Sequence, residues 1–244
     1  MTYCLGILLP QGLVLASDSR SNAGVDQVVR VSKLNLMPEA RDRVIAIQSS
    51  GNLATTQAVV TRLHEAFGAG DAANDLGLAR TMFEVATILG AHLRATIVAD
   101  AKFVEPYGDA AANFLVAGQI AGEPPRLFQI YAAGNFVEAS PRSPFLQIGE
   151  TKYGKPILDR SLTPNCPLDE AAKLALISFD ATIRSNLSVG LPIDLLAYRA
   201  DSFAANPVTI EEDDPYWNAL RQAYSQGLLA LVGGLPKPPP AWGA

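Results

Sequence analysis

The chain has 244 residues, of which 49% are hydrophobic and 18% charged, and its formal net charge is −5. A chain of about 200–250 residues fits one large domain as well as two small ones. Its 19 lysines and arginines are scattered, which argues against a surface that follows nucleic-acid phosphates. No stretch approaches the roughly 20 apolar residues of a membrane span, and no basic residue precedes the first apolar run as in a secretory signal. We therefore expect neither nucleic acid nor a membrane as a partner.

The two cysteines, Cys4 and Cys166, lack the spacing of a metal-binding or redox pair. We interpret them as buried thiols in a reducing compartment, which predicts a cytoplasmic protein. The mean hydropathy is +0.16, and we expect further copies of the chain to cover part of the apolar surface. The composition thus favours a homo-oligomer.

The chain opens with four predicted strands and no helix. Apolar runs over 3–10 and 13–16 form a hairpin with its turn at Gln11-Gly12. A second strand pair covers 28–37 and 43–48, and the segment between these strands has the residues of a turn.

Helices and further strands follow in alternation. Apolar residues recur at helical spacing over 52–67 and 76–98, and Asn74 or Asp75 is placed to cap the second of these helices. The later elements are strands over 113–120, 126–132, 136–139 and 145–148, helices over 151–161 and 167–186, strands over 193–199 and 208–210, and a helix over 216–231.

This order of elements predicts an α+β fold, in which helices cover the outer faces of two sheets as a four-layer αββα sandwich. We predict a single domain over residues 1–234 and a Pro-rich extended tail over residues 235–244. The helices over 76–98 and 216–231 are expected to contribute contacts between subunits.

The sequence lacks most of the motifs that hydrolases use. Its two histidines, His64 and His92, fall within predicted helices, where a surface or core-edge position is the plainer interpretation. There is no GxSxG, HExxH, P-loop or GxGxxG motif. We predict no metal and no cofactor, so hydrolytic chemistry needs a nucleophile that works without histidine.

Thr2 offers such a nucleophile if Met1 is removed, because an N-terminal threonine uses its own α-amine as the base. The hairpin returns Asp18 to the side of Thr2, and Lys33 interrupts an apolar strand. These two side chains are expected to pair beneath the nucleophile, although a turn aspartate and an edge-strand lysine explain the spacing without any function. Retention of Met1 would block the amine as an amide.

Several separated segments resemble the proteasome β-type subunits of the N-terminal nucleophile (Ntn) hydrolases. The matching features are Thr2, the run Asp18-Ser19-Arg20 with Gly24, Lys33 (about one residue earlier than in most β-subunits), and the turn Ser49-Ser50-Gly51 before a helix. The likeness is greatest to the bacterial branch called Anbu, and it is carried by TYCLGILLPQGLVLASDSRSNAGVD, SSGNLATTQ, IGETKYGKPILDR and RSNLSVGLPIDLL. It covers the chain from residue 2 to about residue 230.

The resemblance implies a role for each matching residue. Thr2 attacks the amide carbonyl through its hydroxyl oxygen, and its α-amine takes up the proton and passes it to the leaving amine. Lys33 and Asp18 supply supporting charges. A backbone N–H of Ser50 or Gly51 forms the oxyanion hole.

Two positions depart from the pattern of active β-subunits. Glu150 stands where a supporting serine is expected. In the later Asp-x-x-Ser pair, Ser188 matches the serine and Ser185 replaces the aspartate. The additional carboxylate favours a cationic or small amide as the substrate over ordinary unfolded protein.

The sequence leaves three functions open. One is an N-terminal threonine amide hydrolase, either a threonine-type endopeptidase or a small-amide hydrolase, in a self-assembled ring or open spiral with an unidentified ATP-dependent partner. Another is a non-catalytic proteasome-like scaffold protein. The third is an unrelated α+β binding module, which a monomeric chain would favour.

Overall fold

The computed structural model describes residues 2–22 and 28–239. The chain divides into two compact units, one ending at Glu211 and the other beginning at Glu212. The predicted domain over residues 1–234 groups the last helix with the preceding elements, whereas in the structure this helix belongs to the second unit. Periodicity identifies a helix but does not reveal which other elements it packs against.

The first unit is built on two antiparallel five-stranded sheets and a short ribbon. The first sheet has the order β10 (Phe145–Gly149), β1 (Tyr3–Leu9), β2 (Gly12–Asp18), β11 (Ile193–Arg199) and β12 (Val208–Ile210). The second has the order β5 (Leu34–Leu36), β6 (Arg43–Gly51), β7 (Ala112–Ile120), β8 (Arg126–Ile130) and β9 (Phe136–Glu138). The ribbon consists of β3 (Arg20–Asn22) and β4 (Val28–Arg30).

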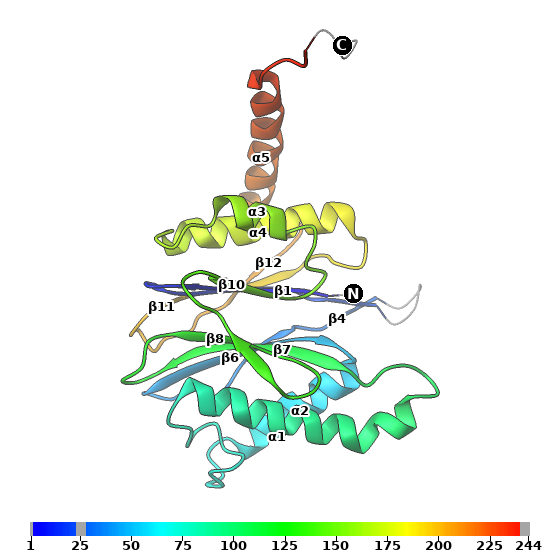
Figure 1. The fold of residues 1–244 in the computed structure, drawn as a ribbon, viewed down its shortest axis with the longest axis vertical. Coiled ribbons are helices and arrows are strands. Elements are labelled where there is room, and N and C mark those ends of the chain that lie inside the picture. Colours follow the sequence, from blue (N-terminus) through cyan, green and yellow to red (C-terminus); the bar gives the residue numbers. More distant parts are fainter. Residues whose placement is uncertain (1, 23–27, 240–244) are drawn as a thin grey trace. The chain divides into compact units, whose positions relative to one another are not determined.

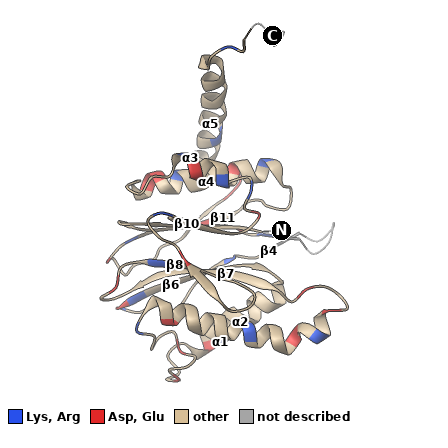
Figure 2. Ribbon diagram, viewed as in Figure 1, with Lys and Arg blue, Asp and Glu red and all other residues tan. Residues whose placement is uncertain are grey.

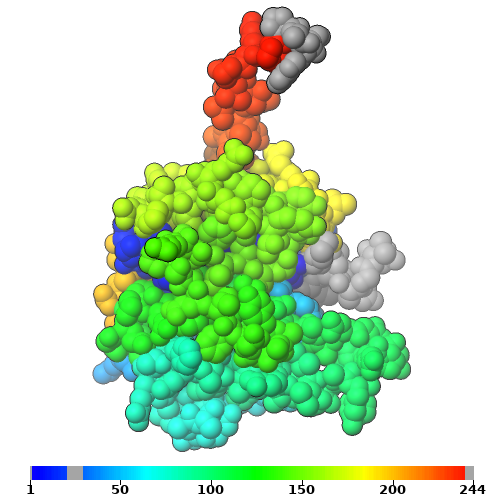
Figure 3. Space-filling model, viewed as in Figure 1, coloured from blue at the N-terminus to red at the C-terminus, as the bar shows by residue number. Residues whose placement is uncertain are grey.

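The two sheets face each other, and helices lie on their outer faces (Figure 1). Helices α3 (Lys155–Ser161) and α4 (Leu168–Ser185) cover the first sheet, whereas α1 (Leu53–Ala66) and α2 (Met82–Val104) cover the second. The α+β class predicted from the sequence is confirmed. In the space-filling view, little of the dark blue β1–β2 hairpin reaches the visible face, because neighbouring segments cover it (Figure 3).

Alternation along β6 divides its side chains between two cores. Val44 and Ala46 belong to the core between the sheets, together with Cys4 and Leu15. Ile45 and its neighbour two residues on belong to the core under α1 and α2. A shift of one residue would exchange these two faces, so the apolar pattern fixes the register of the strand.

Helix α2 is long and apolar enough to cross a membrane by length and composition alone. The expectation that no segment approaches this apolar content is therefore wrong for α2. Buried residues of the helix, among them Val85, Leu89 and Leu93, fill the core on the outer face of the second sheet. That core accounts for much of the apolar content of the helix.

Charged residues lie mostly on helices and loops, whereas the ribbons of the two sheets are mostly tan (Figure 2).

The first hairpin forms as predicted, but its turn lies one residue earlier. Residues 10 and 11 make the turn, and Gly12 is already the first residue of β2. Gly12 has φ +145°, and a Cβ on it would lie 1.9 Å from the carbonyl oxygen of Tyr198. Glycine is therefore required there by the neighbouring strand as well as by the turn.

The predicted strand over 28–37 is wrong as a single element. It is two short strands, β4 in the ribbon and β5 at the edge of the second sheet. The break covers residues 31–33, where the N–H of Val31 donates to the carbonyl of Ser19 and the Ser32 hydroxyl lies within hydrogen-bond distance of that of Leu34. Lys33 lies in this break and not in the middle of a strand.

The helix predicted over 76–98 instead begins at Met82 and ends at Val104. Thr81 is its N-cap and accepts the N–H of Glu84. Asp75 is buried and accepts the N–H groups of Gly68, Gly70 and Gly77, so it organises the preceding loop and does not cap the helix. The backbone N–H groups of its own loop therefore bind this carboxylate in place of the N–H groups at the start of the helix.

The other predicted elements are present with small shifts at their ends. Helix α3 begins at Lys155, four residues later than the predicted start at residue 151. In the second unit, α5 covers Pro215–Gly234, and the Asp214 side chain caps it by accepting the N–H of Trp217. Several large apolar side chains of this unit are exposed, among them Leu229, Leu231 and Val232.

Candidate active site

The backbone of Thr2 is held on both sides. Its carbonyl accepts the N–H of Glu150 at 2.7 Å, and the N–H of the next residue, Tyr3, donates to Oδ1 of Asp18 at 2.9 Å. Gly149 has φ +83°, and a Cβ there would lie 1.9 Å from the carbonyl oxygen of Thr2. Contacts from β2 and from the end of β10, the strands that flank β1, thus hold the Thr2–Tyr3 segment.

Asp18 and Lys33 form a buried ion pair beside this segment. Nζ of Lys33 lies 3.1 Å from Oδ1 of Asp18, and it donates to the carbonyls of Asp18 at 3.0 Å and Arg20 at 2.6 Å. The side chain of Asp18 is fully buried, and 7% of the Lys33 side chain is exposed. An ammonium has three N–H donors, and these three acceptors account for them. The pairing predicted from the sequence is present in the structure.

Burial dominates the electrostatics of Asp18. It raises the pKa of this carboxyl above its ordinary value, against the opposing effects of the Lys33 charge and the Tyr3 N–H. Desolvation penalises the ionised form, whereas the lysine and the hydrogen bonds favour it. The pair therefore places a desolvated charge next to the Thr2–Tyr3 peptide.

The register of β6 distinguishes the two candidate oxyanion donors. Ser50 pairs with Asn113 of β7, and the N–H of Asn52 donates to the carbonyl of Ala111. Because N–H groups of an antiparallel strand alternate in direction, the Ser50 N–H is directed at β7 and the Gly51 N–H away from it. That second side is the side of β5. The Gly51 N–H is thus the donor directed toward β5, the edge strand of the sheet. Lys33 is the residue immediately before this strand.

Glu150 is connected to Ser188 through Asn186, which was not predicted from the sequence. Its Oε2 accepts Nδ2 of Asn186 at 2.9 Å, and Oδ1 of Asn186 accepts the N–H of Ser188 at 2.9 Å. Glu150 is buried, and its Oε1 lies 3.6 Å from Nζ of the exposed Lys152. Ser185, the last residue of α4, is exposed and takes no part in the site hydrogen bonds of the described residues.

Asp194 is a second residue that sequence reasoning missed. It is a nearly buried carboxylate on β11 that accepts hydroxyl groups from Ser19, Ser32 and Thr209. The signal was available, because a single aspartate interrupts the apolar run of this strand. Met1 and Gly24, which also enter the sequence-based prediction of the site, lie outside the described residues.

Other titratable residues lie apart from these contacts. His64 is exposed, and burial lowers the pKa of the partly buried His92. Cys4 and Cys166 are buried free thiols, and burial raises the pKa of both. Among the described residues, no group of three His, Cys, Asp or Glu side chains is arranged to hold a metal ion.

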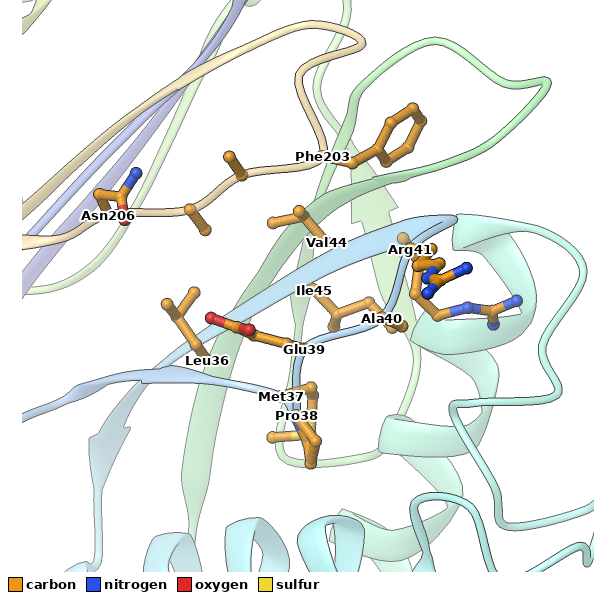
Figure 4. Close-up of a pocket in the computed structure, with 13 residues that line it drawn as sticks. Leu36, Met37, Pro38, Glu39, Ala40, Arg41, Val44, Ile45, Phe203 and Asn206 are labelled. Carbon is orange, nitrogen blue, oxygen red and sulfur yellow. The ribbon is translucent and has the colours of Figure 1, made fainter.

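A cavity of about 450 Å³ lies at the other end of the sheets. Figure 4 shows the loop that carries Phe203 and Asn206 on one side of it, with Leu36, Glu39 and Ile45 on the other. The loop lies between β11 and β12, and the other three residues lie at or beyond the end of β5 and at the start of β6, whereas Lys33 precedes β5 and Gly51 ends β6. The cavity is therefore separate from the candidate active site.

Solved structures resemble the chain over nearly its whole length. No protein-family model matches the sequence, and no curated protein matches it. "Anbu (ancestral beta-subunit) from Yersinia bercovieri" is 44% identical with a TM-score of 0.91, over 97% of this chain and 98% of that one. A Gly-1 mutant of Anbu from Hyphomicrobium sp. strain MC1 is 44% identical with a TM-score of 0.90, over 98% and 100%. The structure described as "Helical Assembly of the Anbu Complex from Pseudomonas aeruginosa" is 42% identical with a TM-score of 0.92, over 98% and 99%.

Proposed function

Because the chain belongs to the Anbu family of proteasome-like β-subunits, we propose that it is an N-terminal threonine amide hydrolase. The observation that carries the proposal is the shared oxygen of Asp18, which accepts the N–H of Tyr3 and pairs with Lys33. This oxygen joins Tyr3, the residue after the proposed nucleophile Thr2, to the buried ion pair. The two facing sheets with helices on their outer faces agree with an Ntn-type αββα sandwich.

In the proposed mechanism, Thr2 becomes the first residue after Met1 is removed. Its hydroxyl attacks the amide carbonyl, and its free α-amine takes up the proton and delivers it to the leaving amine. Lys33 and Asp18 provide fixed charges beside the Thr2–Tyr3 peptide. The Gly51 N–H stabilises the oxyanion, and loss of such a donor typically raises a barrier by about 2.7–4 kcal/mol.

We propose that the chain works as a homo-oligomer. The Pseudomonas aeruginosa relative is described as a helical assembly, and a head-to-tail interface that does not close produces such a spiral instead of a ring. Helices α2 and α5 carry exposed apolar side chains, including Phe83, Phe103 and Leu229, that suit contacts between copies. We also propose a cytoplasmic location, with no membrane or nucleic acid as a partner.

The proposed substrate is a peptide or a small amide, and the simplest activity is that of a threonine-type peptidase. A non-catalytic assembly protein is the second candidate, since Glu150 and Ser185 replace the side chains expected in active β-subunits. Membership of the Anbu family removes the third possibility, an unrelated binding module.

Covalent trapping tests the proposal directly. The purified assembly is treated with a β-lactone, and the modified residue is found by mass spectrometry, with Edman degradation to identify the first residue. We expect Thr2 at the N-terminus and the label on Thr2, with no label in Thr2→Ala. Label on another residue, or turnover of an amide by chains that retain Met1, would overturn the mechanism. An intact assembly without label or turnover would favour the scaffold function.

A further inference from the structure

Asp194 collects three hydroxyl groups around one nearly buried carboxylate. Its Oδ2 accepts the hydroxyl of Ser19 at 2.8 Å, and its Oδ1 accepts that of Thr209 at 2.9 Å. The Ser32 hydroxyl lies 2.8 Å from the same Oδ2, and its single proton is shared between this oxygen and the Leu34 carbonyl at 2.9 Å. Only 9% of the residue is exposed. Among the described residues, no cationic side chain forms an ion pair with it, so hydroxyl donors alone satisfy this carboxylate.

The two serines are the chain neighbours of the buried ion pair. Ser19 follows Asp18, and Ser32 precedes Lys33. Both hydroxyls lie within hydrogen-bond distance of the same oxygen, Oδ2 of Asp194. One carboxylate oxygen therefore ties together the two segments that carry the opposite charges of the pair.

Backbone contacts make this connection rigid on the Ser19 side. The Ser19 N–H donates to the carbonyl of Pro192, and its carbonyl accepts the N–H of Val31 at 2.8 Å. Asp194 itself is held in β11, where it pairs with Ser17 of β2. On the other side, Ser32 lies in the break between β4 and β5, outside any strand. Its position therefore depends on side-chain contacts such as this one.

We propose that Asp194 is a positioning residue, which holds Asp18 and Lys33 at their separation through Ser19 and Ser32. The inference rests on the proposed function, because it concerns the geometry beneath Thr2. Asp194 does not touch the ion pair and has no chemical step of its own. Displacement of a reacting constellation by about 1 Å typically costs about 100-fold in rate, so loss of this carboxylate slows the reaction of Thr2.

The experiment measures how fast a β-lactone acylates Thr2 in the full, processed assembly. It separates the maximal rate of modification, kinact, from the inhibitor concentration at half-maximal rate, KI. We expect Asp194→Asn to lower kinact about 10- to 100-fold with KI unchanged, since inhibitor recognition does not involve this residue. Ser19→Ala and Ser32→Ala, each of which removes one donor, should lower kinact by smaller factors.

Asp75→Asn is the matched control. Asp75 is also a buried aspartate, but it accepts backbone N–H groups in the loop before α2. Its replacement should lower the melting temperature and leave kinact as in the wild type. A merely structural role of Asp194 predicts the same behaviour for Asp194→Asn.

The outcomes separate this inference from the function on which it rests. Wild-type protein that is not labelled on Thr2 would overturn both. Labelled wild type with an equal kinact in Asp194→Asn would overturn the positioning role alone. If Asp194→Asn does not assemble, the two serine variants decide, and unchanged kinact in both would reject the proposal.

Discussion

Oδ1 of Asp18 lies 3.1 Å from Nζ of Lys33 and accepts the backbone N–H of Tyr3 at 2.9 Å. The position of the peptide after Thr2 is thereby coupled to a buried ion pair. A change at the lysine therefore affects both the stability of the fold and the orientation of the candidate nucleophile.

We predict that Lys33→Met destabilises the fold by about 3–5 kcal/mol, because it leaves the Asp18 carboxylate buried without its partner. Adding Asp18→Asn to this variant should recover most of the loss, since no uncompensated charge remains. Lys155→Met is the control: Lys155 pairs with Asp159 at an exposed site, where such a pair is worth up to about 1 kcal/mol. Chemical denaturation at a fixed protein concentration measures all three. Equal losses in the two lysine variants would contradict the prediction.

Gly149→Ala is expected to disturb Thr2 directly. Its φ of +83° disfavours any side chain, and the new Cβ would lie 1.9 Å from the Thr2 carbonyl oxygen. We predict a loss of about 2–5 kcal/mol from strain and overpacking together, and slower labelling of Thr2 by a β-lactone.

Gly122→Ala provides the comparison for that prediction. Gly122 has φ +91°, but a Cβ there would meet no atom within 4 Å. This variant should lose only the strain of a left-handed residue, about 1–2 kcal/mol, with labelling unchanged. Labelling of Gly149→Ala at the wild-type rate would show that the contact with the Thr2 carbonyl does not matter for reactivity.

The contact between Asp18 and the start of the chain could be predicted because a short turn sets the register of a hairpin. That register pairs Cys4 with Ser17, so Asp18 falls beside the residue that follows Thr2. Lys33 could be selected because a lysine in an apolar segment needs a partner. The likeness to the Anbu branch, read from four sequence segments, is confirmed by relatives that are 42–44% identical.

The aspartate within an apolar strand could have drawn attention to Asp194, but the partners of Asp194 and Asn186 could not be predicted, because they come from distant parts of the chain. Asp194 binds serines that are 175 and 162 residues away, and Asn186 reaches Glu150 across 36 residues. A local pattern carries no information on such pairs. The start of α2 was wrong for a related reason: Asp75 has the residue type of an N-cap, but three glycine N–H groups of its own loop bind it.

Tyr3 predicts a specific alkaline destabilisation. Burial raises its pKa to about 12, while hydrogen bonds with Ser178 and Gln147 oppose this effect. Because the folded-state pKa exceeds the ordinary value of 10.0, the contribution of Tyr3 to stability is complete below pH 10 and is lost as the pH rises toward 12. The loss should reach about 2–3 kcal/mol.

The measurement for Tyr3 is denaturation of the wild type and Tyr3→Phe between pH 8 and pH 12. Tyr3→Phe should be less stable at pH 8, where it lacks the hydroxyl hydrogen bonds. The difference between the two proteins should shrink as the pH rises, because only the wild type has this hydroxyl to ionise. A constant difference over the whole range would contradict the assigned pKa.

Glu150 predicts the charge preference of the proposed enzyme. Its side chain is buried, and its backbone N–H donates to the Thr2 carbonyl, a bond that a side-chain substitution leaves in place. Glu150→Gln removes the charge but keeps an oxygen for Asn186. We expect kcat/KM for lysine-containing amide substrates to fall by up to about fivefold relative to matched neutral ones, as for a partly solvated charge pair. Lys152→Gln should shift the preference the other way, because Lys152 lies 3.6 Å from the same carboxylate. If neither variant changes the ratio, Glu150 supports the Thr2 backbone and does not select the substrate.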